Sequence, residues 1–155
     1  MKIWIDGDAC PKQVKEVIFR ASERTKSLVM IVANKAMRVT HSPLIQLIVV
    51  SDGFDAADHY IVEHTETNDM VITADIPLAS ALVDKGVMVI NSRGMVYTSE
   101  NIKEVLAVRN LMEELRGGGF GSLSGGPAAY GPKDLEKFSN SFDRELARLV
   151  KKQSL

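Results

Sequence analysis

The sequence has only one cysteine, no long apolar run and no excess of charge of either sign. A lone cysteine, Cys10, cannot form an internal disulfide. No stretch approaches the roughly 18 apolar residues of a membrane span, and the opening apolar run ends at Asp6, before it could form the core of a secretory signal. We therefore expect a cytoplasmic protein without a membrane segment. Nineteen basic and twenty acidic residues give a net charge of −1, which neither requires nor excludes a nucleic-acid partner.

The length of 155 residues and the 45% hydrophobic content suit one compact domain and are too small for two ordinary ones. No internal repeat is visible. Seven of the eleven glycines fall within residues 117–131, which predicts a glycine-rich loop. Pro132 then opens a pattern of apolar residues at three- and four-residue steps. We expect a single domain over 1–155, with a C-terminal helix over 132–152 that covers an apolar surface.

Short apolar runs alternate with amphipathic stretches along the chain. This order predicts a three-layer α/β fold, with a mostly parallel sheet of about five strands and helices on both faces. A helix that begins at a Ser99 cap is expected to lie on this sheet. The expected strands run from the N-terminus to Asp6 and over 28–33, 47–50, 70–73 and 87–90, and the other expected helices cover 11–25, 56–65, with Asp55 as its cap, and 76–86.

Right-handed crossovers place the carboxyl ends of parallel strands at one edge of the sheet, where open α/β sheets bind ligands. Carboxylates accumulate at this edge. Asp58 joins them because it falls in the first turn of a helix, on the same side as Ile61 and Val62. Asp69 precedes its strand and is expected at the opposite edge. The polar residues that follow the five strands are Asp6 and Asp8, Asn34 and Lys35, Asp52, Thr73 and Asp75, and Asn91 and Arg93.

Carboxylates that converge without cations repel one another, and a hard divalent cation with oxygen ligands relieves this repulsion. The chain has no histidine and cysteine cluster with zinc spacing, so Mg²⁺ or Mn²⁺ is the favoured ion. Such an ion orients a phosphate and lowers the pKa of a bound water. The pattern therefore predicts a metal-dependent phosphoryl-transfer site.

The order Asp6, Asp58 and Asp75, with the segment V-I-T-A-D-I-P-L-A around the last, resembles PIN and NYN-like nuclease domains. The whole chain resembles the YaiI/YqxD family of uncharacterised bacterial proteins, through I-D-G-D-A-C-P, R-G-M-V-Y-T and F-S-N-S-F-D-R-E-L. The PIN/NYN resemblance implies a ribonuclease-like centre that uses Mg²⁺ or Mn²⁺ and acts on single-stranded or structured RNA. It implies catalytic roles for Asp6, Asp58 and Asp75, with Asp8 as a further metal ligand.

Each aspartate also has an ordinary structural interpretation. Asp8, Asp55 and Asp75 precede helix starts and could serve as caps. We accept this role for Asp55 and favour a metal ligand at Asp75, whereas Asp52 fits a turn or a ligand equally well. Cys10 at a helix start could be a nucleophile, although a small half-buried residue is the better interpretation.

Basic residues leave the strand ends beside the acidic cluster, where they could bind substrate phosphates. These are Lys35, Arg38 and Arg93, and for the first two an ordinary solvated loop charge is an equal alternative. The segment 117–131 could close over RNA, with Phe120 and Tyr130 stacking on bases. A flexible connection to the last helix is the favoured interpretation. The segment lacks the spacing of a P-loop.

Two other functions remain open. Asp6-Gly7-Asp8 after a hydrophobic strand resembles the D-x-D motif of haloacid-dehalogenase-like phosphatases, in which Asp6 would be the nucleophile and Asp8 the acid or base. Against it, a helix starts at Pro11, too soon for the usual flap. The third possibility is a protein that binds RNA or a nucleotide without catalysis on the same scaffold.

Overall fold

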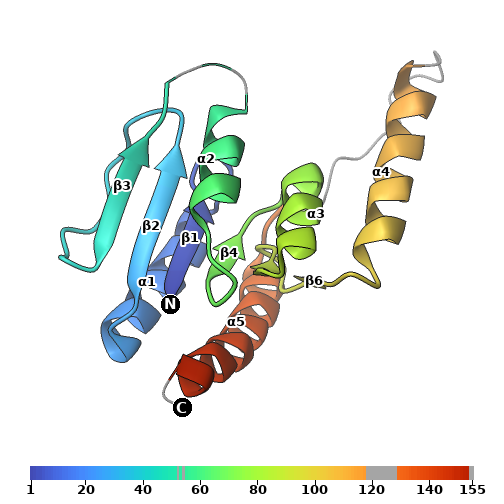
Figure 1. Ribbon diagram of the computed structural model, residues 1–155. Helices are drawn as coiled ribbons and strands as arrows, with labels where there is room; N and C mark the ends of the chain where they lie inside the picture. Colours follow the sequence, from blue (N-terminus) through green and yellow to red (C-terminus); the bar gives the residue numbers. More distant parts are fainter. Residues whose placement is uncertain (52, 54, 118–128, 154–155) are drawn as a thin grey trace.

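The computed structural model describes residues 1–51, 53, 55–117 and 129–153, and a six-stranded sheet lies at its centre (Figure 1). The strand order is β3-β2-β1-β4-β5-β6, and every neighbouring pair is parallel except β5 and β6. The strands are β1 (Lys2–Asp6), β2 (Leu28–Ala33), β3 (Ile45–Val49), β4 (Met70–Ile72), β5 (Met88–Ile90) and β6 (Val96–Tyr97), and the helices are α1 (Lys12–Thr25), α2 (Ala56–His64), α3 (Ile76–Lys85), α4 (Ile102–Gly117) and α5 (Pro132–Gln153).

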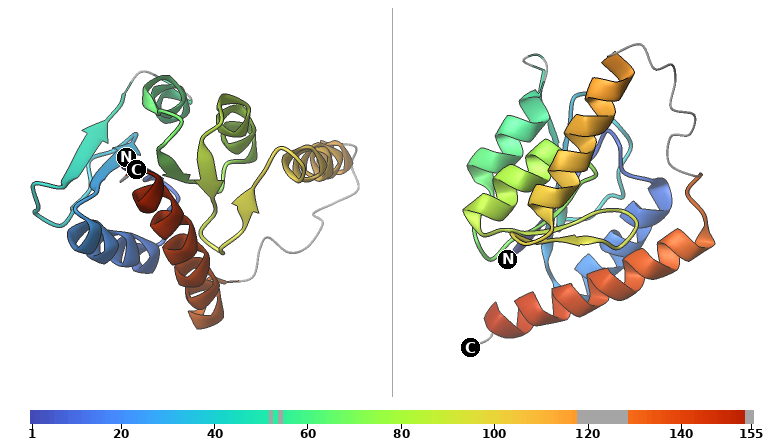
Figure 2. Two further views of the ribbon diagram at one scale, coloured as in Figure 1. Left: turned by 60° about the horizontal axis from the view of Figure 1, so that its bottom comes forward. Right: turned by 90° about the vertical axis from the view of Figure 1, so that its right-hand side faces the viewer.

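Helices cover both faces of the sheet. Because side chains alternate along a strand, Ile3 and Ile5 of β1 face α1 and α5, whereas Trp4 faces α2 and α3. Figure 2 shows these two helix pairs on opposite sides of the sheet. The three-layer, mostly parallel α/β fold predicted from the sequence is therefore confirmed, and its layers are consistent with a PIN-like architecture.

The C-terminal helix α5 is part of the core. Phe138, Phe142 and Leu146 recur every four residues on one face and are almost completely buried against β1, β2 and α1. The two phenylalanine rings stack with centroids 5.3 Å apart. The sequence pattern predicted a helix in need of an apolar surface, and the open face of the sheet supplies it.

The sheet has one strand more than the five expected. β6 is only two residues long and pairs antiparallel with β5, so it lacks the apolar run that marked the other strands. The helix expected to begin at Ser99 also differs. Its first turn is closed by reciprocal hydrogen bonds between Thr98 and Asn101, at 2.8 and 3.1 Å, and Ser99 is not the cap.

The expectation that this helix lies on the sheet is wrong. α4 packs against the outer side of α3, and Ile102 is its only buried residue. Figure 1 shows α4 standing apart from the three layers. A helical period identifies an apolar stripe but not the surface that the stripe meets.

Asp69 lies at the edge of the sheet that holds the amino ends of the strands, as its position before β4 predicted. Its buried carboxylate accepts hydrogen bonds from the Trp4 indole at 3.0 Å and from the backbone N–H groups of Lys2 and Glu66 at 2.9 and 3.0 Å. Asp69 therefore has a structural role. Among the described residues, no helix is long and apolar enough to cross a membrane.

Candidate active site

The candidate site lies where the direction of strand addition reverses. The chain adds β2 and β3 on one side of β1 and then returns to place β4 on the other side. The carboxyl ends of β1 and β4 thus diverge into different crossover connections, which opens a crevice between them. Asp6 ends β1 at this point, and Asp75 follows β4 by three residues.

An open cleft of about 450 Å³ occupies this crevice. All four predicted metal ligands line it, and they come from three parts of the fold. Asp6 and Asp8 come from the end of β1, Asp58 from the first turn of α2 and Asp75 from the residue that precedes α3. The sequence prediction that these carboxylates converge is therefore met by the geometry, although their roles stay predictions.

Thr73 links two of the carboxylates. Its hydroxyl donates to Oδ2 of Asp6 at 3.0 Å and accepts the backbone N–H of Asp75 at 3.0 Å. Oδ1 of Asp75 in turn caps α3 by accepting the N–H of Leu78 at 2.9 Å. One oxygen of Asp75 is thus held by the helix, so Asp75 is a cap, and its role as a metal ligand stays a prediction.

Asp8 is held by the neighbouring strand end. The backbone N–H of Asn34, just after β2, donates to both carboxylate oxygens at 2.9 and 3.2 Å. Gly7 allows this approach, because a Cβ there would lie 2.8 Å from Cγ2 of Ile31 and 3.2 Å from the Val32 carbonyl oxygen. The Asp-Gly-Asp sequence therefore lets two carboxylates flank a backbone that runs tightly against β2.

The electrostatics of the cleft disfavour its negative charge. Burial raises the pKa of Asp58 to about 7, and the charges of Asp75, Asp6 and Asp55 and a hydrogen bond with Asp75 act in the same direction. Burial also raises the pKa of Asp6, and Asp75 and Asp8 add to this effect against the hydrogen bond from Thr73. Within the described residues, no ion pair involves any of the four predicted ligands.

Asp55 corrects one sequence interpretation. It occupies the cap position of α2, but its backbone is left-handed, with φ of 65°, and its side chain makes no capping hydrogen bond. It lines the cleft instead. The sequence signal that could have placed Asp55 in the cleft is its position three residues before Asp58, at the start of the same helix. Asp52, the other uncertain aspartate, lies outside the described residues.

The predicted phosphate-binding residues differ in their surroundings. Lys35 and Arg38 are exposed beyond β2, and no described ion pair involves them. Arg93 forms a 2.8 Å ion pair with Asp134 in the first turn of α5, and its guanidinium lies 5.6 Å from the Tyr130 ring centroid. Sequence reasoning missed the Arg93–Asp134 pair because these residues lie far apart along the chain.

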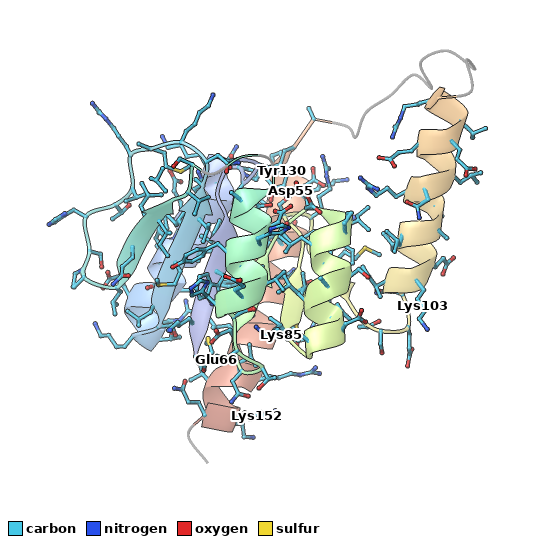
Figure 3. The ribbon with its side chains drawn as sticks, turned by 45° about the horizontal axis from the view of Figure 1, so that its top comes forward. Asp55, Glu66, Lys85, Lys103, Tyr130 and Lys152 are labelled. Carbon is cyan, nitrogen blue, oxygen red and sulfur yellow. The ribbon has the colours of Figure 1, made fainter. Side chains whose placement is uncertain are left out.

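The segment before α5 returns to the same edge. The Tyr130 hydroxyl donates to the Ser92 carbonyl at 2.8 Å, and Ser92 lies beside Asp6 and Cys10 in a small neighbouring pocket. Figure 3 shows Tyr130 and Asp55 at one end of the molecule and Glu66 and Lys85 toward the other. Most of the glycine-rich loop, including Phe120, lies outside the described residues.

Cys10 does not have the surroundings of a reactive thiol. Burial raises its pKa to about 12, and the nearby Asp6 adds to this increase while Lys15 opposes it. A thiol with such a pKa stays protonated at neutral pH. This supports the interpretation of Cys10 as a half-buried residue.

In the described part of the chain, no three carboxylate, imidazole or thiol groups stand close enough to hold a metal ion as they are placed. This does not conflict with the chemistry of magnesium, which commonly keeps several waters and binds through one or two carboxylates. The cleft offers only oxygen donors, the set that Mg²⁺ and Mn²⁺ prefer.

Fold and site together define an α/β protein with an acidic cleft at the carboxyl edge of a parallel sheet. The chain belongs to a family described as uncharacterised, the YaiI/YqxD family, whose model matches residues 4–148. The predicted resemblance to the YaiI/YqxD family is thereby confirmed.

Curated relatives span the whole chain, and each is named a UPF0178 protein. One from Maridesulfovibrio salexigens is 51% identical over 148 residues, which cover 96% of this chain and 97% of the relative. One from Shewanella loihica is 48% identical over 152 residues, covering 98% and 100%. One from Geobacter metallireducens is 49% identical over 151 residues, covering 97% and 96%. No solved structure is similar enough to this chain to count as a match.

Proposed function

We propose that the protein is a metal-dependent nuclease of the PIN/NYN-like type that hydrolyses phosphodiester bonds of RNA. The observation that supports it best is the convergence of Asp6, Asp58 and Asp75 in one open cleft at the point where strand addition reverses. The raised pKa of Asp58 is the expected signature of carboxylates that lack a countercharge. A divalent cation would supply that countercharge.

In this proposal Asp6, Asp8, Asp58 and Asp75 would hold Mg²⁺ or Mn²⁺, and the ion would supply charge to orient the scissile phosphate and to lower the pKa of a water. Thr73 positions Asp6 through its hydroxyl, and the α3 backbone fixes one oxygen of Asp75. Asp58 has a pKa of about 7 in the cleft without a cation, and a bound cation would lower this pKa, so metal binding would be coupled to release of the Asp58 proton. Lys35 and Arg38 bind phosphates along the cleft rim, and Arg93 does so after exchanging Asp134 for the phosphate.

The proposal is tested by Mn²⁺ calorimetry beside a cleavage assay on a pool of single-stranded RNA. Asp75→Asn removes the charge but keeps the oxygen that caps α3, so the fold is preserved. The matched control is Asp84→Asn, at the far end of the same helix. We expect the Mn²⁺ affinity of Asp75→Asn to fall at least about tenfold, as when other residues that hold or orient a metal ion are changed. Metal-dependent cleavage should be lost with it. Asp84→Asn should match the wild type in both assays.

The outcomes separate the alternatives. Absence of Mn²⁺ binding at millimolar concentration would reject the metal centre. Metal and RNA binding without cleavage would favour a binding protein. A phosphorylated Asp6 trapped from a phosphomonoester would favour the phosphatase, although α1 begins at Lys12, which leaves little chain after Asp8 for the flap of that family.

A further inference from the structure

α4 carries an exposed apolar stripe. Val108 is 50% exposed, Leu111 53% and Met112 41%, and Met95 beside the helix is 43% exposed. These four are among the five large hydrophobic residues described as exposed, so the exposed apolar surface is concentrated in one place. A groove of about 600 Å³ runs along the stripe, between α4 and the start of α3. Patches of this kind mark interaction surfaces.

α4 is anchored to the rest of the fold along one side. Only Ile102 is buried along its 16 residues, and its main contact is with α3. The views in Figure 2 show the helix projecting beyond the sheet. A helix of this length is marginal in water without tertiary packing of its apolar face. The side of α4 that carries the stripe therefore stays open to a second surface.

The chemistry of the stripe favours a protein surface over a nucleic acid. Its side chains are aliphatic or thioether, and none of the described residues that line the groove has an aromatic ring on which a base could stack. Arg109 pairs with Glu113 of the same helix at 3.1 Å, so the groove carries no excess of positive charge at this point. The rim has both signs of charge, with Glu104 in the first turn and Arg116 in the last.

The stripe is complementary to itself. When two copies of α4 run antiparallel about a two-fold axis at the level of Asn110, Val108 lies opposite Met112 of the second copy. In the same register Glu104 lies opposite Arg116, and symmetry repeats each contact. Asn110 itself points away, because it lies half a turn from the stripe. Val108 and Met112 thus form an apolar centre, Leu111 lies at the level of Arg109 of the second copy, and an ion pair closes each end.

We propose that this face of α4 is a homodimer interface in which two copies pair antiparallel in this register. The wall of the groove formed by Ile76 and Met95 extends the contact beyond the helix pair itself. An isologous interface of this kind is closed, so it gives dimers and not filaments.

The mass of the full chain, measured by sedimentation equilibrium over a wide concentration range, tests the proposal. We expect the wild type to reach twice the 17.0 kDa of the monomer. Met112→Lys places a charge in the apolar centre and should weaken dimerisation at least about tenfold. Asn110→Lys adds the same charge to the opposite side of the same helix and should dimerise like the wild type. Circular dichroism verifies that both variants are folded.

A charge swap tests the register. Glu104→Arg and Arg116→Glu each place like charges opposite one another and should weaken the dimer, whereas the double variant should restore it. A wild type that stays monomeric at all concentrations would overturn the proposal, as would a dimer that tolerates Met112→Lys. Single swaps that match the double variant would overturn the register. RNA binding that Met112→Lys abolishes in a monomeric protein would assign the groove to nucleic acid instead.

Discussion

The cleft is built by single residues that tie strand ends together. Thr73 bridges Asp6 and the backbone of Asp75, and Asn34 holds Asp8. These contacts keep carboxylates near one another although they repel, and the energetic cost is visible in the raised pKa values of Asp58 and Asp6. Negative charge is therefore unfavourable in the cleft of the free protein, and binding of a proton or of a cation would relieve the repulsion.

Asp58 should therefore make the stability of the metal-free protein depend on pH. Its pKa is about 7 in the folded chain, above its ordinary value of 3.8, so the folded state binds this proton more tightly. The resulting stabilisation is complete below about pH 4 and is lost as pH rises through 7. We expect Asp58→Asn to exceed the wild type in stability at pH 8 by about 1 to 2 kcal/mol, after allowance for the partial exposure of this side chain.

Urea denaturation with EDTA at pH 5 and pH 8 measures this difference. The stability of the wild type should fall more between the two values than that of Asp58→Asn. Asp84→Asn, an exposed aspartate on α3, should follow the wild type. If the stability of the wild type and of Asp58→Asn depended equally on pH, the cleft would not raise the pKa of this carboxyl.

The sequence predicted the convergence of Asp6, Asp58 and Asp75, because strand ends and first turns place side chains at a known edge. It could not reveal that Asp55 lines the cleft, because the left-handed backbone at that residue is set by the tertiary path of the loop. The Arg93–Asp134 pair was equally hidden, since it requires knowledge of where α5 docks.

At the scale of elements, the turn between β5 and β6 fixes the start of α5. Gly94 has φ of 90°, and its Cα lies so close to α5 that an added Cβ would stand 2.6 Å from the carbonyl oxygen of Lys137. Arg93 and Tyr130 add side-chain contacts at the same junction. The small β6 strand, which has no sequence signal of its own, thus supports the helix that covers one face of the sheet.

Gly94→Ala should destabilise the protein by about 2 to 4 kcal/mol, because it combines backbone strain with a clash against α5. Gly53→Ala is the matched control. Gly53 has nearly the same φ, 92°, but nothing within 4 Å of the added Cβ, so it should cost only about 1 kcal/mol. Thermal unfolding of the two variants measures the contribution of the α5 contact as their difference. Equal losses of stability in the two variants would mean that α5 moves away from the added methyl group without an energetic cost.

At the scale of the whole molecule, one sheet separates two apolar layers. Ile3, Ile5 and Phe142 belong to the layer beneath α1 and α5, and Trp4 to the layer beneath α2 and α3. The sequence predicted this arrangement well because alternating strands and helices leave few parallel topologies. It failed for α4, whose apolar residues follow a helical period, since the choice between α3 and the sheet depends on three-dimensional surfaces that the helical period does not encode.

Because both layers share the central strands, the two faces should unfold as one cooperative unit. Trp4 is the only tryptophan, so its fluorescence reports the α2 and α3 face alone, whereas far-UV circular dichroism reports every helix. Phe142→Ala opens a cavity on the opposite face and should cost about 3 to 5 kcal/mol. We expect the urea midpoints from both probes to fall together in this variant, as they coincide in the wild type. A helical signal that is lost before the Trp4 signal changes would mean that α5 can detach from the sheet while the face that carries Trp4 stays folded.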